Sequence, residues 1–158
     1  RVHRGFFTAE LAQSLEGGYR TVIMSEVLEH FPDPREPVRL VWRVLAAGGL
    51  LLVSTPNVES FLCRRFQQKP REHLFLFSAR SLRLLLEQEG FAVLQMEKTS
   101  RRRPLGELGY STTNLGRARM LIDVLGSLGF GHFLARVLEV LARDELVAVA
   151  VKDRRRCR

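Results

Sequence analysis

The chain has 158 residues, 46% of them hydrophobic, which is enough to bury one sizeable core and is typical of a single globular domain. Its formal net charge is +8, but most of the excess comes from the arginine run 101–103 and the tail 152–158. The basic residues therefore form a loop and a tail rather than a continuous basic face, which disfavours a nucleic-acid or membrane-surface binder.

The first predicted elements are a short helix and a buried strand. Thr8 can cap a helix that has Glu10 in its first turn and stops at Gly17-Gly18. The apolar run 21–24 follows, and residues 20–24 are predicted to form a strand. This strand leads directly into the segment 25–30, which contains two glutamates and a histidine. Open α/β sheets bind ligands at the C-terminal ends of their strands, so this polar segment is the first candidate site.

The next segment predicts a second helix and a second buried strand. Pro37 suits the first turn of a helix that closes at Gly48, and the apolar residues of this helix recur at i, i+3, i+4 and i+7: Val38, Val41, Trp42 and Leu45. The run 50–54 then predicts a strand in a sheet that is covered on both faces, and it ends in Thr55-Pro56-Asn57. Polar residues thus follow both predicted strands.

The C-terminal half continues the alternation of helix and strand. Ser78 caps a helix that ends at Gly90 and has three leucines on one face: Leu82, Leu85 and Leu86. Residues 91–96 and 146–151 predict two further strands. Between them, the segment 99–143 predicts two helices broken by glycines. The order of elements predicts an α/β fold with parallel βαβ units.

These motifs, in this order, resemble the class I S-adenosylmethionine-dependent methyltransferases, and in particular the branch of ubiquinone-type O-methyltransferases. The resemblance covers roughly residues 19–98 and is carried by the following motifs: Glu26-Val27-Leu28-Glu29-His30, Pro32-Asp33-Pro34, Gly48-Gly49, Ser54-Thr55-Pro56-Asn57, His73-Leu74-Phe75-Leu76-Phe77-Ser78 and Gly90-Phe91. It implies a Rossmann-like, doubly wound methyltransferase sheet. That sheet is mostly parallel, and its antiparallel last strand lies between the two strands that precede it in the sequence.

The chain departs from this family in one respect. It has no G-x-G-x-x-G motif, and it lacks the acidic residue that the family places after that motif to hold the ribose. We therefore expect residues 1–158 to be the C-terminal two-thirds of a single methyltransferase domain whose first strands are missing, and to be inactive alone. Within it, 99–143 would form a helical insertion or lid, or pack its leucines on the sheet, and 152–158 a basic tail.

The predicted reaction is methyl transfer from S-adenosylmethionine to a small molecule, with an oxygen nucleophile as the acceptor. An imidazole is a natural acceptor for a hydroxyl proton, which makes His30, with Glu29 beside it, the candidate catalytic group. The alternative for His30 is a capping or satisfied polar role. Glu26, Glu29 and His30 also have the composition of a divalent-metal site, a pattern that the resembled quinone methyltransferases associate with a cation, but a metal is not favoured.

The resemblance also implies positions for the cofactor and the substrate. It places Met24, Ser25 and Glu26 beside S-adenosylmethionine. Asn57 and His73 lie where substrate contacts are expected, although Asn57 can equally be a turn residue after Pro56.

The remaining features concern compartment and alternatives. Two cysteines, Cys63 and Cys157, lie far apart, and neither a signal peptide nor a transmembrane segment is evident, so we expect a cytoplasmic protein without a structural disulfide. The main alternative to an enzyme is a degenerate or truncated methyltransferase-fold module that acts by binding a partner.

Overall fold

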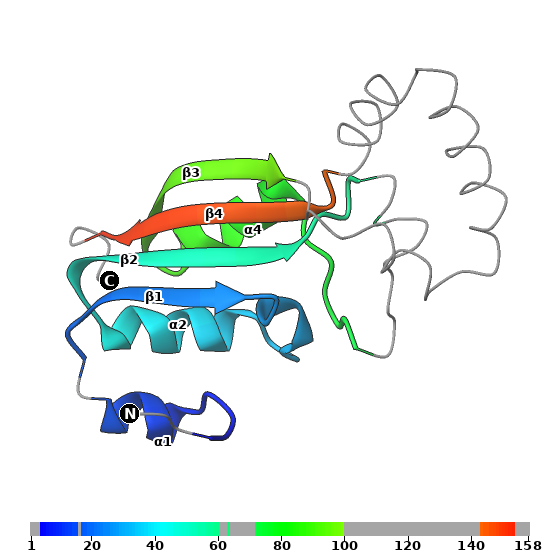
Figure 1. Cartoon of the computed structure of the whole chain (residues 1–158). Helices are drawn as coiled ribbons and strands as arrows, with labels where there is room; N and C mark the ends of the chain where they lie inside the picture. The colour runs from blue at the N-terminus through cyan, green and yellow to red at the C-terminus, as the bar shows by residue number, and fades with distance from the viewer. Residues whose placement is uncertain (1–3, 16, 61–62, 64–71, 100–142, 154–158) are drawn as a thin grey trace, which may run out of the picture.

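The structure is a computed structural model that describes residues 4–15, 17–60, 63, 72–99 and 143–153 (Figure 1). The predicted insertion or lid at 99–143 and most of the basic tail lie outside the described residues. The elements follow one another in this order: α1 (Ala9–Ser14), β1 (Tyr19–Ser25), the 3-10 turn η1 (Leu28–His30), α2 (Arg35–Val44), β2 (Leu45–Pro56), α4 (Ala79–Gln88), β3 (Phe91–Thr99) and β4 (Glu145–Lys152).

The strands form one mixed sheet in the order β1-β2-β4-β3 (Figure 1). Strands β1 and β2 are parallel, and β4 is antiparallel to both of its neighbours. The last strand therefore lies between β2 and β3, as the resemblance implied. The predicted α/β class is confirmed. No described helix combines the length and the apolarity that a membrane crossing needs.

Helix starts follow the predicted capping residues. The Thr8 side chain accepts a hydrogen bond from the Leu11 backbone N–H at the start of α1. At the start of α4, Ser78 and Ser81 exchange side-chain and backbone hydrogen bonds in a capping box. These contacts satisfy backbone donors that have no partner inside the helix.

The end of α2 differs from the prediction. The helix stops at Val44, and Leu45 has an extended backbone with φ −72° and ψ 139°. Leu45 instead begins β2, where it pairs with Tyr19 of β1. Leu45 also continues the helical spacing of apolar residues that begins at Val38, so the spacing alone does not mark the end of the helix.

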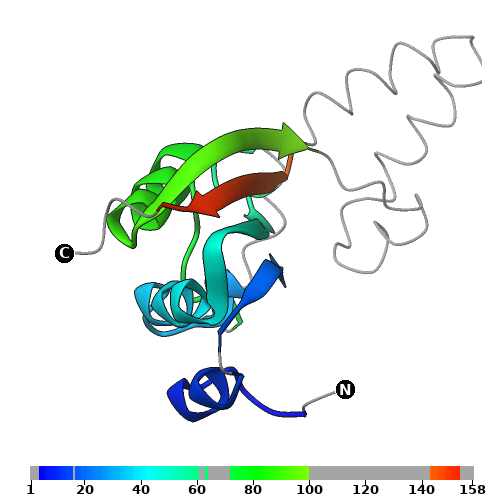
Figure 2. The ribbon, with the colours of Figure 1, turned by 90° about the vertical axis from the view of Figure 1, so that its left-hand side faces the viewer.

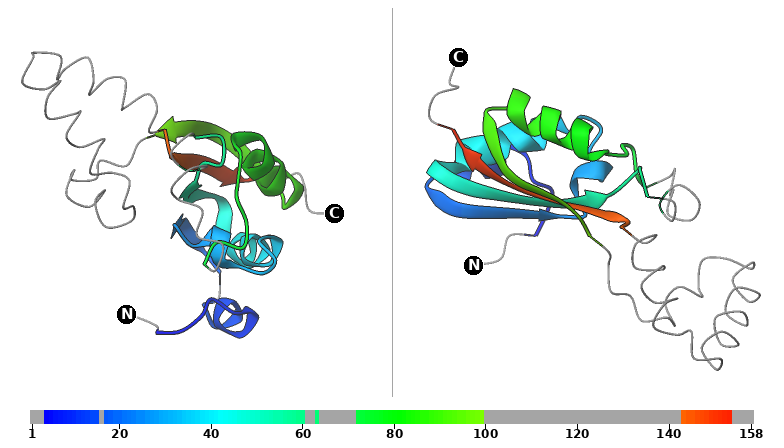
Figure 3. Two further views of the ribbon diagram at one scale, coloured as in Figure 1. Left: turned by 90° about the vertical axis from the view of Figure 1, so that its right-hand side faces the viewer. Right: turned by 90° about the horizontal axis from the view of Figure 1, so that it is seen from above.

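Helices α2 and α4 lie on the same face of the sheet (Figures 2 and 3). Their apolar side chains pack with alternate residues of the strands, such as Leu51, Val53 and Ala148, to form the main core. The short helix α1 packs on α2 instead of the sheet. Glu89, just after α4, accepts hydrogen bonds from Arg35 and Arg39 of α2 and thereby links the two helices. Helices α2 and α4 thus cover one apolar face of the sheet, and polar residues such as Ser25 and Ser54 lie near the C-terminal ends of β1 and β2.

Candidate functional site

The polar cluster begins where β1 and β2 end. In the parallel register Ser25 lies beside Ser54, and their hydroxyl oxygens are 3.2 Å apart. Beyond Ser25, the Glu26 N–H donates to the Ser54 carbonyl at 2.9 Å. Glu26 has φ +51°, a left-handed conformation that is uncommon for a residue with a side chain. This tight backbone turn leads the chain from β1 into η1.

Glu29 is a fully buried carboxylate, with 0% of its surface exposed. The Thr55 hydroxyl donates to Glu29 Oε2 at 2.9 Å. Within the described part of the chain, Glu29 Oε1 has no hydrogen-bond partner. A buried carboxylate oxygen without a partner is costly, so this atom marks a place where a proton, a cation or a donor belongs.

The His30 ring is held in one orientation against Glu29. Its Nδ1 lies 2.7 Å from the Glu72 backbone carbonyl. Because a carbonyl only accepts hydrogen bonds, this contact assigns the ring proton to Nδ1 and leaves a lone pair on Nε2 when the ring is neutral. Nε2 lies 3.9 Å from Glu29 Oε1. An acceptor nitrogen therefore faces an acceptor oxygen.

His73 is brought to the cluster by the backbone of Glu29. The Leu74 and Phe75 N–H groups donate to the Glu29 carbonyl at 2.8 and 3.2 Å. The His73 ring then meets the His30 ring edge to face, with centroids 5.0 Å apart. One ligand atom from each of Glu29, His30 and His73 lies within 4.8 Å of the other two. The structure thus joins the two predicted catalytic residues to a predicted substrate residue.

Asn57 is buried two residues after Thr55, and its side chain holds two neighbouring loop segments in place. Its Nδ2 donates to the Arg143 carbonyl at 2.8 Å, and its Oδ1 accepts from the Glu59 N–H at 3.1 Å. The Asn57 N–H also donates to the Asp144 carbonyl. Of the two roles that the sequence allowed, these contacts favour the turn residue over the substrate contact.

The three predicted cofactor residues differ in what they expose. The Met24 side chain is buried in the core, so only its backbone is available at the strand end. Ser25 is exposed and Glu26 is half-buried. Glu26 lies outside the group of potential ligand atoms that Glu29, His30 and His73 form. The sequence placed Thr55 in the polar run after the second strand but assigned it no role, because its contact with Glu29 depends on the pairing of the two strands.

The nearby cysteine is not a reactive candidate. Cys63 is buried, and burial raises the pKa of its thiol, with a further rise from the negative charges of Asp144 and Glu26. A thiol in such surroundings stays protonated at neutral pH and is a poor nucleophile.

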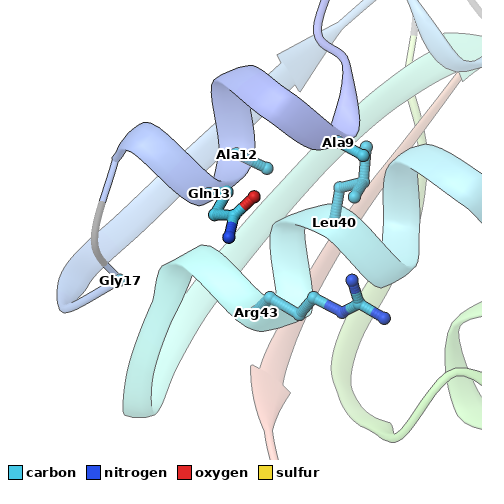
Figure 4. A pocket seen from close by; sticks show the side chains of 6 residues that line it. All are labelled: Ala9, Ala12, Gln13, Gly17, Leu40 and Arg43. Atoms are coloured by element: carbon cyan, nitrogen blue, oxygen red, sulfur yellow. The ribbon is translucent and has the colours of Figure 1, made fainter.

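Two shallow hollows on the surface lie away from the polar cluster. One lies between α1 and α2 (Figure 4) and is lined by the following residues: Ala9, Ala12, Gln13, Gly17, Leu40 and Arg43. The other lies at the N-terminal ends of β1 and β2, near Arg20 and Gly48. Neither hollow contains a predicted site residue, so the polar cluster is the better candidate for chemistry.

Comparison with known proteins gives a family and a fold. Residues 1–96 match a family described as "Methyltransferase domain". None of the curated proteins matches the chain. Among solved structures, a methyltransferase from Archaeoglobus fulgidus that depends on S-adenosylmethionine is 20% identical, with a TM-score of 0.57; the match covers 90% of this chain and 64% of that one.

Two other similar structures point to the same fold. A possible histamine N-methyltransferase from Thermotoga maritima is 17% identical with a TM-score of 0.55, and the match covers 87% of this chain and 57% of that one. A complex of the Haloferax volcanii Trm112 methyltransferase activator with a methyltransferase gives 16% identity, a TM-score of 0.57 and coverage of 87% and 56%. The chain thus spans little more than half the length of such proteins, and at these identities the likeness shows the fold alone.

Proposed function

The chain belongs to the methyltransferase domain family, and we propose that the protein it represents transfers a methyl group from S-adenosylmethionine to an oxygen atom of a small molecule. The observation that carries this proposal is the cluster of Glu29, His30 and His73 beside the C-terminal ends of β1 and β2. A methyltransferase has to align the acceptor with the methyl group, exclude water and remove a proton when the acceptor is a hydroxyl. The cluster supplies groups for the last task.

S-adenosylmethionine supplies the methyl group when it is bound. The groups of this chain that suit it are the exposed Ser25 hydroxyl and the backbone from Met24 to Glu26. The Ser54 hydroxyl, 3.2 Å from that of Ser25, adds a second polar group at the same strand ends. These groups fit the polar amino-acid part of the cofactor, which needs hydrogen-bond donors and acceptors.

A complete cofactor site needs residues that this chain does not contain. The glycine-rich loop and the ribose carboxylate of the family do not occur in its 158 residues. We infer that the chain forms the C-terminal two-thirds of a methyltransferase domain, which agrees with its coverage of 56 to 64% of three similar structures. Hydrogen bonds to charged groups contribute about 1.5–3 kcal/mol each, so the chain alone is expected to bind the cofactor weakly.

His30 is the proposed proton acceptor. Its Nε2 carries the lone pair of the neutral ring, and 42% of the His30 side chain is exposed. The Glu29 carboxylate lies 3.9 Å from Nε2, on the side of the ring that would receive the proton. His73, packed against the His30 ring, is placed to contact the acceptor.

Calorimetry with S-adenosylmethionine tests the inference that residues 1–158 hold only part of the cofactor site. Residues 1–158 are expected to bind hardly at all, and a longer protein that includes the glycine-rich loop is expected to bind tightly. Tight, micromolar binding by residues 1–158 would contradict the inference that the chain is part of a domain. Tight binding by the longer protein without methyl transfer to any hydroxyl compound would favour the alternative of a binding module.

The role of His30 is tested in the longer protein by His30→Ala. Turnover should fall about 100-fold or more, because a general base contributes about 10²–10⁴-fold, while affinity for S-adenosylmethionine stays within a few fold. Arg83→Ala, on the exposed side of α4, serves as the control and should leave turnover unchanged. A loss of turnover that only follows the folded fraction in melting experiments would assign His30 a structural role.

A further inference from the structure

The contact between His30 and Glu29 pairs two hydrogen-bond acceptors. Glu29 Oε1 is buried without a hydrogen-bond partner among the described residues, and His30 Nε2, the acceptor nitrogen of the neutral ring, faces it at 3.9 Å. Two such lone pairs repel unless a positive charge lies between them or beside them. The available positive charges are a proton and a metal ion.

Three features of the cluster favour a metal ion. His73 adds a second imidazole, and one ligand atom of each residue lies within 4.8 Å of the other two. The non-ligating atoms are also held, since His30 Nδ1 contacts the Glu72 carbonyl and Glu29 Oε2 accepts from Thr55. Metal-binding histidines and carboxylates have such supporting hydrogen bonds in most proteins, because these bonds fix the ring tautomer and the direction of the ligand atom.

We propose that Glu29, His30 and His73 bind a divalent transition metal of the zinc type. Two imidazoles and one carboxylate suit Zn²⁺, Co²⁺ or Ni²⁺, whereas Mg²⁺ and Ca²⁺ prefer oxygen ligands. The site differs from the Glu26, Glu29 and His30 set that the sequence suggested, because Glu26 lies outside the group and His73 lies inside it.

The ligand atoms must move closer together when the metal binds. Zn²⁺ lies about 2.0–2.2 Å from nitrogen and oxygen ligands, which requires them to approach one another more closely than 4.8 Å. For His30 Nε2 and Glu29 Oε1, which are already 3.9 Å apart, the required movement is small. Three protein ligands leave one position open for water or for an acceptor oxygen. A bound metal would occupy the lone pair of His30 Nε2. His30 can therefore act as the proposed proton acceptor only in the metal-free protein.

Titration of the metal-free, untagged chain with Zn²⁺, followed by calorimetry, tests the proposal without any measurement of methyl transfer. The unaltered chain is expected to bind one Zn²⁺ with micromolar or tighter affinity and to melt at a higher temperature when Zn²⁺ is present. His73→Ala and Glu29→Gln should each weaken binding at least tenfold. Glu26→Gln is the matched control and should change the affinity less than twofold.

Two results would overturn the proposal. The first is the absence of saturable Zn²⁺ binding by the unaltered chain. The positive charge between Glu29 and His30 would then be a shared proton, and the proposed methyl transfer would be unaffected. The second is unchanged affinity in His73→Ala together with a loss in Glu26→Gln. His73→Gln, which keeps a polar side chain, and circular dichroism of each metal-free variant show whether a loss of binding reflects a lost ligand or a lost fold.

Discussion

The two faces of the sheet differ in what covers them. On one face, alternate strand residues such as Leu51, Val53 and Ala148 are fully buried under α2 and α4. On the other face, Ile23 of β1 is 68% exposed, its cross-strand partner Leu52 is only half-buried, and so is Val149, which pairs with Leu52 from β4. Figure 3 shows both sheet-packed helices on the first face. The described residues therefore cover one apolar face and leave the other largely open.

This difference explains why the strands have continuous apolar sequences. A sheet with one face in water alternates apolar and polar residues, whereas a sheet covered on both faces is apolar throughout. Residues 50–53 are all leucine or valine, and β4 reads Leu-Val-Ala-Val-Ala-Val from Leu146. The sequence thus provides for a second covering layer, which agrees with the proposal that the chain is part of a longer domain. Three sets of substitutions, centred on Leu51, Ser78 and Ile23, test the contrast between the faces.

The largest effect is expected on the covered face. Leu51→Ala removes a fully buried side chain beneath the helices and should lower the free energy of unfolding by about 2–5 kcal/mol. Urea unfolding followed by circular dichroism measures this change. Leu84→Ala, at a leucine of α4 that is 54% exposed, is the matched control and should cost far less. Equal losses at Leu51 and Leu84 would contradict the assignment of the core.

A smaller effect is expected from the start of α4, which helps to hold that helix on the covered face. Ser78→Ala removes the capping side chain and should cost about 1 kcal/mol, because the Ser81 N–H loses its acceptor. Ser78→Gly should cost only a few tenths of a kcal/mol, since glycine is tolerated at this position. The same urea experiment measures both variants. If both variants unfold with the same free energy as the unaltered chain, the capping box contributes nothing to stability.

The sequence predicted most of this architecture because the relevant signals are local or belong to the family. Thr8 and Ser78 mark helix starts through short-range hydrogen bonds, and the position of β4 follows from the resemblance. The predicted end of α2 was wrong because Leu45 continues the helical spacing of apolar residues although it is the first residue of β2, so periodicity does not separate the two. The backbone of Leu45 pairs with that of Tyr19 in β1, and this pairing makes Leu45 a strand residue.

The candidate site was predictable only in part for a similar reason. Glu29 and His30 are adjacent in the sequence and follow a clear strand, so their segment could be identified. The position of His73 depends on two hydrogen bonds from its neighbours to the Glu29 carbonyl, and the Thr55 contact depends on strand pairing. Neither contact can be read from the spacing of residues in the sequence. For this reason the metal ligands suggested by the sequence included Glu26, whereas the structure brings His73 to Glu29 and His30.

The smallest effect on stability is expected on the open face, and it gives the sharpest test of the contrast. Ile23→Thr keeps a β-branched side chain on β1 and reduces exposed apolar surface, so it should change the free energy of unfolding of residues 1–158 by less than about 0.5 kcal/mol. The unaltered chain should self-associate, because β1 has a free edge and an apolar face among the described residues. Analytical ultracentrifugation should show weaker self-association of Ile23→Thr.

The same substitution should have a different effect in a longer protein that contains the proposed upstream part of the domain. If that part covers Ile23, replacing a buried isoleucine by threonine places a hydroxyl in the core and should cost more than about 1 kcal/mol. An equally small cost in both proteins, together with a sharp two-state melt of a monomeric residue 1–158 chain, would contradict the need for a second layer. The chain would then be a complete small domain that tolerates an exposed apolar face, and its polar cluster would have to bind its ligands without upstream residues.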